Sequence, residues 1–361
     1  MATQPSHNAP LDPRTGTGMA RRERLGAALA GARVDRVPVS AWGHFFTDEV
    51  DPDRFIAATL AFQERYDWDF LKVHSRASYH VEGWGFTYAR SNDPAKGHVC
   101  TGHPIATAAD WRKLRPLDPD STALAEQLRI LERLKKAVGT ELPVIMTVFS
   151  PLDIAEKLID RDSAMLKRHI DEDPAALEAA LDAIARTFAP FVREVVRLGA
   201  DGIYFSTKWA NNVKLSAAQY QRLVRSYDLA VLEEAKPMWC NLLHLCEDHV
   251  QLSAMADYPV QVFHWDTHAG HNPSFPQGKP LLRTGPPRLS ARAMGGGVDP
   301  ETLATGTPAE VETRAIRSIR QIGGRGLVLG PGCSVQMAKT PPENLFALRR
   351  SPALAALEMQ H

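Results

Sequence analysis

The sequence has little cysteine, no excess charge of either sign and no long apolar run, and each absence excludes a class of protein. Lys and Arg number 42, as do Asp and Glu, and no basic cluster stands out, so a nucleic-acid surface is not expected. Four cysteines in 361 residues are too few for a disulfide framework, which predicts a reduced, cytoplasmic protein. No apolar run approaches the ~18 residues that a membrane span needs.

The N-terminal segment also lacks the apolar core of a signal peptide. Residues 1–18 are polar and rich in Pro and Gly, and we predict that they form a disordered arm. Residues 19–361 show no linker and no internal repeat. They are therefore predicted to form a single domain, and their length provides ample core.

Short apolar runs alternate with amphipathic stretches along this domain. The expected strands are 37–42, 70–73, 143–148, 202–205, 238–243, 260–263, 292–296 and 326–329. The expected helices are 21–30, 53–65, 122–138, 174–198, 217–235, 250–256, 308–321 and 342–357. Short apolar strands separated by helices suit a parallel sheet that is buried on both faces. The pattern predicts an α/β protein with a (β/α)8 TIM barrel rather than a doubly wound sheet.

Two stretches are longer than the loops of a bare barrel. Residues 75–116, rich in Tyr, Trp, Gly and His, are predicted to form a hairpin excursion after the second strand. Residues 268–289, rich in Pro and Gly, are expected to be a loop after the sixth strand. Both leave C-terminal strand ends, where barrel enzymes place their active sites, so we interpret them as lids.

Three residues with the chemistry of metal ligands follow two of the expected strands. His244 and Cys246 come at the end of the fifth strand in LLHLCED, and Cys333 follows the eighth strand in LVLGPGCSV. Strand residues two apart point the same way, and a closed barrel brings both strand ends to one rim. One imidazole and two thiolates suit Zn²⁺ with a fourth position open for substrate. From the residues alone a second interpretation stays open, with buried apolar thiols and a hydrogen-bonded histidine.

Two further strand ends carry polar side chains. Asp266 leaves the sixth strand in FHWDTH, where we expect it to orient a metal-bound histidine or to hold a substrate cation. Lys208, Trp209 and Asn211 leave the fourth strand and are predicted to line a substrate pocket. A solvated loop explains these three nearly as well.

The chain resembles the uroporphyrinogen decarboxylase superfamily from RRERLGAALAGARVDRVPV to GPGCSVQMAKTPPENLFAL. The stretches that carry the resemblance are GADG at 199–202, LHLCED after the fifth strand, GVDP at 297–300 and TPPEN at 340–344. The resemblance implies a (β/α)8 barrel, in agreement with the order of elements, and a chain able to pair as a homodimer.

The superfamily contains at least two chemistries. True decarboxylases resemble one another in an Arg-rich segment, RQAGR, after the first strand, which binds substrate carboxylates. The corresponding residues 39–46 read VSAWGHFF and contain no arginine. Lys157 stands where the resemblance places a Tyr, and Pro331 where it places a His. Each departure removes a group that the decarboxylase needs.

The other branch comprises the corrinoid-dependent methyltransferases, including the methylcobamide:coenzyme M type. Their zinc signature is H-x-C followed by a distant Cys, which His244, Cys246 and Cys333 match. The resemblance therefore implies a zinc-dependent methyltransferase. It would move a methyl group between a corrinoid, either methylcobalamin or a corrinoid protein as partner, and a thiol or small methylated substrate, in a direction that the sequence does not determine.

Two other functions stay open. One is a cofactor-free, decarboxylase-like lyase for a different carboxylated substrate, in which Arg76, Lys208 or His44 replaces the missing arginines. His44 is for this reason a candidate substrate-binding residue. The other is a catalytically silent barrel that binds a corrinoid or porphyrin as a carrier.

Overall fold

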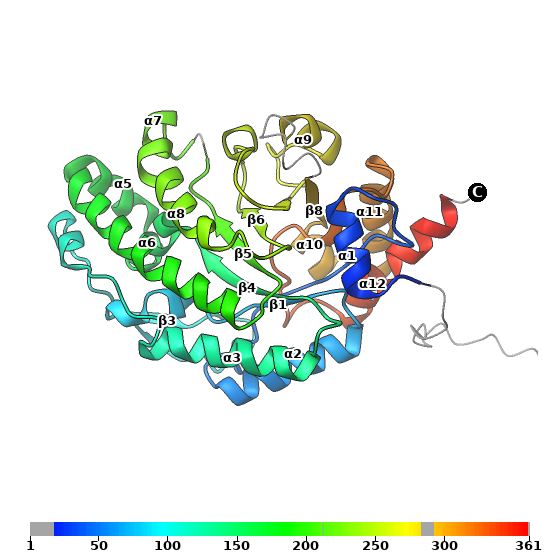
Figure 1. Ribbon diagram of the computed structural model, residues 1–361, viewed down its shortest axis with the longest axis horizontal. Helices are drawn as coiled ribbons and strands as arrows, with labels where there is room; N and C mark the ends of the chain where they lie inside the picture. The colour runs from blue at the N-terminus through cyan, green and yellow to red at the C-terminus, as the bar shows by residue number, and fades with distance from the viewer. Residues whose placement is uncertain (1–17, 212, 283–291, 360–361) are drawn as a thin grey trace, which may run out of the picture.

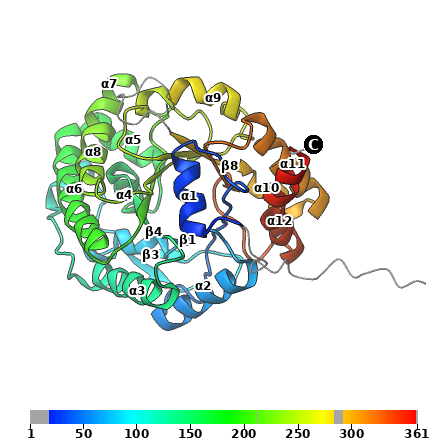
Figure 2. The ribbon, with the colours of Figure 1, turned by 45° about the vertical axis from the view of Figure 1, so that its right-hand side comes forward.

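The centre of the molecule is a curled parallel sheet. The computed structural model describes residues 18–211, 213–282 and 292–359. The sheet has seven strands in the order β1, β4, β5, β6, β7, β8, β9, and helices surround it on the outside (Figures 1 and 2). This arrangement confirms the predicted α/β TIM barrel. Apart from Gly18, the predicted N-terminal arm lies outside the described residues.

Each strand of the sheet overlaps a strand that was predicted from the sequence. They are β1 (Leu71–Val73), β4 (Val144–Phe149), β5 (Gly202–Thr207), β6 (Leu242–Leu245), β7 (Val262–Trp265), β8 (Ala293–Val298) and β9 (Leu327–Pro331). Nearly all of their residues are buried, as expected for parallel strands covered on both faces.

The first predicted strand, 37–42, is not a regular strand. It makes isolated parallel bridges instead, pairing Val39 with Leu329 of β9 and Gly43 with Val335. On its other side the backbone N–H of Asp69 donates to the carbonyl of Val39 at 2.9 Å. Pro38 has no N–H to give to a ladder, which limits regular pairing here. The segment nevertheless lies between the start of β1 and β9 and closes the sheet into a barrel.

Two helices precede β1, and the other helices lie between or after the later strands. The helices are α1 (Arg21–Leu29), α2 (Pro52–Tyr66), α3 (Thr122–Val138), α4 (Pro151–Lys157), α5 (Ser163–Glu172), α6 (Pro174–Arg197), α7 (Ala217–Tyr220), α8 (Ser226–Glu234), α9 (Phe275–Leu281), α10 (Pro300–Thr305), α11 (Pro308–Gln321) and α12 (Pro342–Glu358). The predicted helix 250–256 is wrong, because only a single 3-10 turn, Ser253–Met255, forms there. Within the described ranges, no helix is both long and apolar enough to cross a membrane.

The excursion after β1 contains the predicted hairpin. Strands β2 (Thr87–Ala89) and β3 (Val99–Gly102) pair antiparallel. His98, next to β3, lies 3.4 Å from the buried carboxylate of Glu49, which also contacts His44 Nδ1 at 2.7 Å. Although burial favours the protonated acid, these histidines lower the pKa of Glu49 to about 2. Glu49 thus ties the hairpin to the rim of the barrel.

The N-terminal end of the barrel is closed by α1. Leu25 and Leu29 of this helix pack with Phe70, Ile145 and other residues that fill the barrel interior. Figure 2 shows α1 lying across the opening of the ring of helices. The C-terminal strand ends therefore face the end of the barrel that α1 does not cover.

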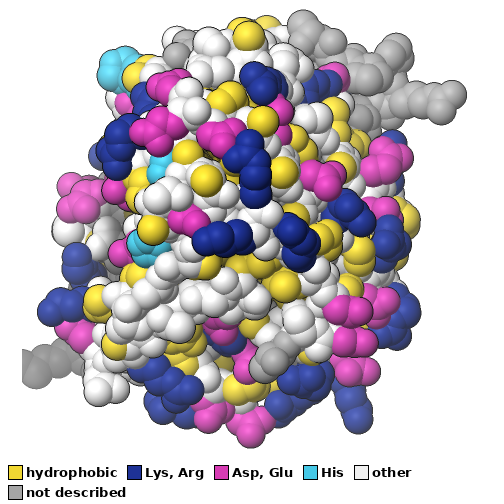
Figure 3. All heavy atoms as spheres, turned by 90° about the vertical axis from the view of Figure 1, so that its left-hand side faces the viewer, with side chains coloured by type: hydrophobic (Ala, Val, Ile, Leu, Met, Phe, Trp, Pro, Cys, Tyr) yellow, Lys and Arg dark blue, Asp and Glu magenta, His cyan; other side chains and the backbone are white. Residues whose placement is uncertain are grey.

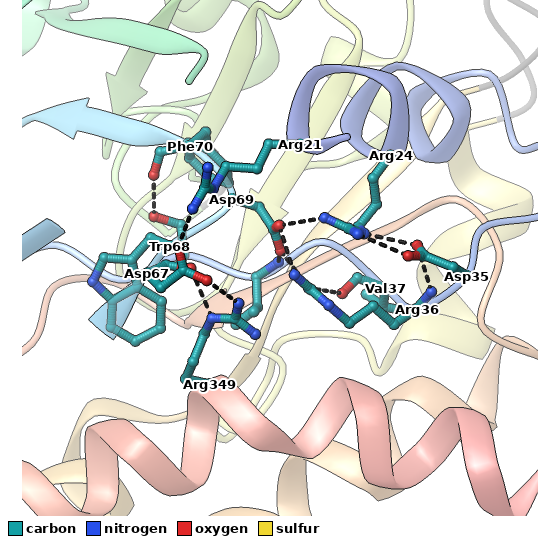
Figure 4. A network of polar contacts seen from close by, with 12 residues as sticks. Arg21, Arg24, Asp35, Arg36, Val37, Asp67, Trp68, Asp69, Phe70 and Arg349 are labelled. Atoms are coloured by element: carbon teal, nitrogen blue, oxygen red, sulfur yellow. Dashed lines mark hydrogen bonds and ion pairs between the residues drawn. The ribbon is translucent and has the colours of Figure 1, made fainter. Parts of the chain in front are cut away.

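A buried ionic network holds α1 and the closing segment to β1 (Figure 4). Asp69 is fully buried and accepts hydrogen bonds from Arg24 Nη1 at 2.8 Å and from Arg36 Nη1 at 2.6 Å. It also accepts one from the backbone N–H of Val39 at 2.8 Å. Although burial opposes ionisation, Arg36 and the other nearby guanidinium groups hold the pKa of Asp69 below its ordinary value. The network is structural and lies away from the C-terminal strand ends.

The outer surface carries mixed charge. On the face shown in Figure 3, Lys and Arg side chains are interspersed with Asp and Glu and with apolar atoms. This distribution agrees with the zero formal net charge of the chain.

Candidate metal centre

The three predicted metal ligands meet at the C-terminal end of the sheet. His244 lies on β6, Cys246 directly follows β6, and Cys333 follows β9. One ligand atom from each lies within 4.8 Å of the others, and the two sulfur atoms are 4.0 Å apart. The fold therefore joins thiols that are 87 positions apart in the sequence.

The strand register decides which side chains surround this group. His244 stands opposite Ser206 of β5 on one side and opposite His264 of β7 on the other. The backbone of β6 continues the ladder to Cys246, whose N–H donates to the carbonyl of Thr207 at 2.8 Å. Because alternate strand residues face the same side, His244 and Cys246 point to one place.

A relay of hydrogen bonds sets the tautomer of His244. His264 Nε2 lies 2.8 Å from the carbonyl oxygen of Pro331, which can only accept, so Nε2–H is the donor. Burial lowers the pKa of His264 well below its usual value, which keeps this ring neutral and leaves its Nδ1 as an acceptor. His244 Nδ1 lies 2.7 Å away and must donate.

The other ring nitrogen of His244, Nε2, consequently carries no proton and has a free lone pair. Nε2 is buried and has no hydrogen-bond partner in the part of the chain that the structure describes. An unpartnered buried acceptor on a histidine that is grouped with two thiols is an arrangement that a metal ion satisfies. His264 acts as the orienting partner that metal-binding histidines commonly have.

The two thiols lie in hydrogen-bond contact, with their sulfur atoms 4.0 Å apart. The hydrogen bond with Cys246 lowers the pKa of Cys333 to about 7, and the nearby Lys72 ammonium contributes. The same hydrogen bond and burial raise the pKa of Cys246 well above its usual value. One thiolate therefore forms close to neutral pH even before a cation neutralises the pair.

This donor set fits Zn²⁺. Two sulfur atoms, each about 2.3 Å from one tetrahedral ion, lie about 3.8 Å apart, close to the 4.0 Å found here. Among the described residues, the group contains one His and two Cys and no fourth protein ligand. Three protein ligands leave one position for a substrate atom, as in catalytic zinc sites.

Asp266 does not contact His244; the orienting contact that we predicted for Asp266 is made by His264. Asp266 instead accepts a hydrogen bond from the backbone N–H of His268 at 2.9 Å. It also packs against the turn before Cys333, because a Cβ on Gly332 would lie 2.6 Å from Asp266 Cγ. Asp266 thus helps to shape the turn that carries a ligand.

The residues after β5 are held in loop contacts. Lys208 forms an ion pair with the buried Glu156 of α4. Trp209 is fully buried, and Asn211 Nδ2 donates to the carbonyl of Asp248 at 2.7 Å. A role for Lys208, Trp209 and Asn211 toward substrate stays a prediction. The same holds for His44, at the rim, whose ring contacts His74 with centroids 4.2 Å apart.

A second group of potential ligands lies nearby on the surface. Asp248, His249 and His271 bring their side-chain donor atoms within 4.8 Å of one another. The carboxylate of Asp248 already accepts hydrogen bonds from the backbone N–H groups of His249 and His271 and contacts the ring of His271. Loop hydrogen bonding accounts for this group.

Three further residues near the C-terminal strand ends are not among the side chains predicted from the sequence. Lys72 lies within β1, and His74 and His80 follow the C-terminal end of that strand. Lys72 could have been identified from the sequence as a candidate functional residue, because it lies inside the apolar run FLKV. A charged amine is rarely found in a strand that is buried on both faces.

Comparisons with known proteins agree with this geometry. The family described as "Uroporphyrinogen decarboxylase (URO-D)" matches residues 20–351. The uroporphyrinogen decarboxylase of Parasynechococcus marenigrum is 28% identical over 257 residues, covering 69% of each chain. That of Trichodesmium erythraeum is 26% identical over 263 residues, covering 70% of each.

Solved structures share the fold. A methyltransferase from Methanosarcina mazei superposes with a TM-score of 0.75 at 21% identity, over 95% of this chain and 100% of the other. A B12-independent methionine synthase from a Shewanella species superposes with a TM-score of 0.56 at 14% identity, over 86% and 88%. Because the family match spans nearly the whole barrel, this chain belongs to the uroporphyrinogen decarboxylase (URO-D) family.

Proposed function

We propose that the protein is a zinc-dependent methyltransferase. It would move a methyl group between a corrinoid, either free methylcobalamin or a corrinoid protein as partner, and a thiol or small methylated substrate. The observation that carries the proposal is the convergence of His244, Cys246 and Cys333, whose ligand atoms lie within 4.8 Å of one another, together with the unpartnered Nε2 of His244. The likeness in fold to a methyltransferase from Methanosarcina mazei supports it.

The residues of the site have two different tasks in this proposal. His244, Cys246 and Cys333 would hold the ion, and His264 keeps the lone pair of His244 Nε2 directed at it. When bound, Zn²⁺ supplies Lewis acidity that keeps a substrate thiol deprotonated at neutral pH, whereas a free thiol with a pKa of about 8.5 is mostly protonated. Two thiolate ligands keep the site electron-rich, which suits a nucleophilic sulfur.

Elemental analysis of the purified protein tests the metal site. We expect about one zinc per chain, and loss of that zinc in both Cys246→Ser and Cys333→Ser. The buried Cys240, outside the group, supplies the control, and Cys240→Ala is expected to keep the metal. A zinc-free parent purified under reducing conditions without chelators would overturn the proposal. With zinc present, methylcobalamin and simple thiols are the first substrates to assay.

A second candidate is a cofactor-free lyase for a carboxylated substrate. The family relatives with 26–28% identity are uroporphyrinogen decarboxylases, and this observation favours it. The cationic residues that could bind a substrate carboxylate give the lyase less support, because acidic side chains already neutralise them. Arg76 is engaged by Glu82 and Glu126, and Lys208 by Glu156. The lyase predicts no metal and full activity in Cys246→Ser, so the same variants separate the two functions.

A further inference from the structure

The turn that follows Cys246 has an unfavourable backbone conformation. Glu247 and His249 have φ angles of 70° and 60°, in the left-handed region that glycine adopts without cost. Other residues persist in this region where surrounding contacts hold them, and such positions cluster at functional sites. Because Glu247 is bonded directly to Cys246, the contacts that hold this turn also affect where the Cys246 thiol lies.

Asn272, on the loop after β7, makes such contacts. Its side-chain nitrogen donates to the carbonyl oxygens of Glu247 at 2.9 Å and of Asp266 at 3.0 Å. Its side-chain oxygen accepts a hydrogen bond from the backbone N–H of Val250 at 3.0 Å. Both N–H groups and the oxygen of this amide are therefore engaged by backbone atoms. One side chain thus bridges the turn after β6 and the turn after β7.

Other contacts hold the later part of the first turn. The carboxylate of Asp248 accepts a hydrogen bond from the backbone N–H of His249 at 2.8 Å. Asn211 donates to the carbonyl of Asp248 at 2.7 Å. Asn272 instead contacts Glu247, one position closer to the ligand.

The same amide is connected to the second thiol. Asp266, whose carbonyl accepts from Asn272, packs against the turn before Cys333, where a Cβ on Gly332 would lie 2.6 Å from Asp266 Cγ. Displacing Asn272 would therefore free both turns that carry a sulfur ligand. The 4.0 Å separation of the two sulfur atoms depends on these turns.

The side chain of Glu247 takes no part in the metal centre. Its carboxylate forms ion pairs with Lys208 and Lys214, and it is 45% exposed. It is not among the three grouped ligands. A substitution at Glu247 therefore changes the backbone freedom of the turn without removing a ligand.

We propose that Asn272 is a positioning residue of the metal centre. By bridging the turns after β6 and β7, it holds Cys246 and Cys333 at the separation that one tetrahedral ion requires. The inference rests on the proposed function, because the thiols that Asn272 positions are the ligands of the proposed zinc site. Asn272 itself touches neither thiol and acts through the backbone.

Metal binding by Asn272→Ala, in the full-length protein, tests the inference. We expect zinc to bind about tenfold more weakly than to the parent, as measured by competition with a chromophoric chelator. Co²⁺ in place of Zn²⁺ reports the coordination geometry, because its visible absorption is strong in a tetrahedral site. We expect that absorption to be shifted and weaker in Asn272→Ala. An unchanged zinc affinity and an unchanged cobalt spectrum would overturn the inference.

Two matched variants narrow the interpretation. Asn272→Asp keeps the size of the side chain and the acceptor for Val250, but places an oxygen before the two carbonyl groups, so we expect the same loss as in Asn272→Ala. Asn92→Ala, at an exposed position of the loop between β2 and β3, should match the parent in both measurements. Thermal unfolding of each variant shows that the barrel is folded.

A rescue experiment separates positioning from general stability. Glycine adopts a φ of 70° without strain, so Glu247→Gly alone should keep the zinc affinity of the parent. Combined with Asn272→Ala, it should recover most of the tenfold loss. A double variant as weak as Asn272→Ala would overturn the inference. A parent that binds neither zinc nor cobalt would instead count against the proposed function.

Discussion

His264 Nδ1 lies 2.7 Å from Nδ1 of His244, and this contact decides which nitrogen of the candidate ligand is free. The carbonyl of Pro331 fixes the proton of His264 on Nε2. The direction of both hydrogen bonds follows from that acceptor. The geometry of the metal centre therefore depends on a residue that touches no thiol.

Removing this orienting contact should weaken metal binding. His264→Phe keeps an aromatic ring of similar shape but leaves His244 Nδ1–H without an acceptor. We expect the affinity for zinc to fall about 10- to 100-fold, the usual effect of losing such a partner. Competition with a chromophoric chelator measures the change. His103→Gln, at an exposed position of the hairpin excursion, is the control, and an unchanged affinity in His264→Phe would contradict the relay.

The turn before Cys333 should tolerate no side chain. In Gly332→Ala the new Cβ would lie 2.6 Å from Asp266 Cγ, so the turn or Asp266 must move. We expect a loss of about 1–3 kcal/mol in the free energy of unfolding, together with weaker zinc binding. Denaturant titration and chelator competition measure the two effects.

A matched glycine shows whether this result is specific. Gly26 lies inside α1, and the nearest atom to an added Cβ is 4.0 Å away, on Trp239. Gly26→Ala should be neutral or stabilise the fold by up to about 1 kcal/mol. Gly332→Ala and Gly26→Ala with equal stability and equal zinc affinity would count against the packing of Asp266 on the turn.

The buried network around Asp69 should dominate the stability of the N-terminal end of the barrel. Asp69→Asn removes the charge that faces Arg24 and Arg36. Because breaking a buried pair leaves an uncompensated charge, we expect a loss of about 3–5 kcal/mol in the free energy of unfolding. Denaturant unfolding measures it. Asp53→Asn, at an exposed ion pair with Arg133, should change stability by less than about 0.5 kcal/mol.

Glu49 should make stability depend on acid pH. Its pKa is about 2 in the folded chain and 4.5 in its ordinary state. A carboxyl group with a lowered pKa stabilises the fold above the ordinary value, and this contribution is lost as the pH falls from about 4.5 toward 2. The difference corresponds to about 3 kcal/mol. Unfolding curves of the parent and Glu49→Gln should converge over that range, and a constant gap would be the contrary result.

The positions of most elements followed from local patterns. The helices at 122–138 and 308–321 begin and end where their apolar spacing predicted. Helix α4 was missed because all but one of its residues are buried, so no polar face marks its period. The closing segment 37–42 was taken for a strand because it is apolar, whereas Pro38 and the pairing partners allow only bridges.

The amino-acid sequence was enough to predict the order of most helices and strands and the ligand types at His244, Cys246 and Cys333, because period, turn residues and ligand chemistry are local properties. The folded structure was needed to show that His264 rather than Asp266 contacts His244, and that Cys246 and Cys333 meet it although 87 positions separate the two thiols. These relations depend on the register between neighbouring strands and on closure of the barrel. Both are set by contacts between residues that are distant in the chain, which local patterns do not encode.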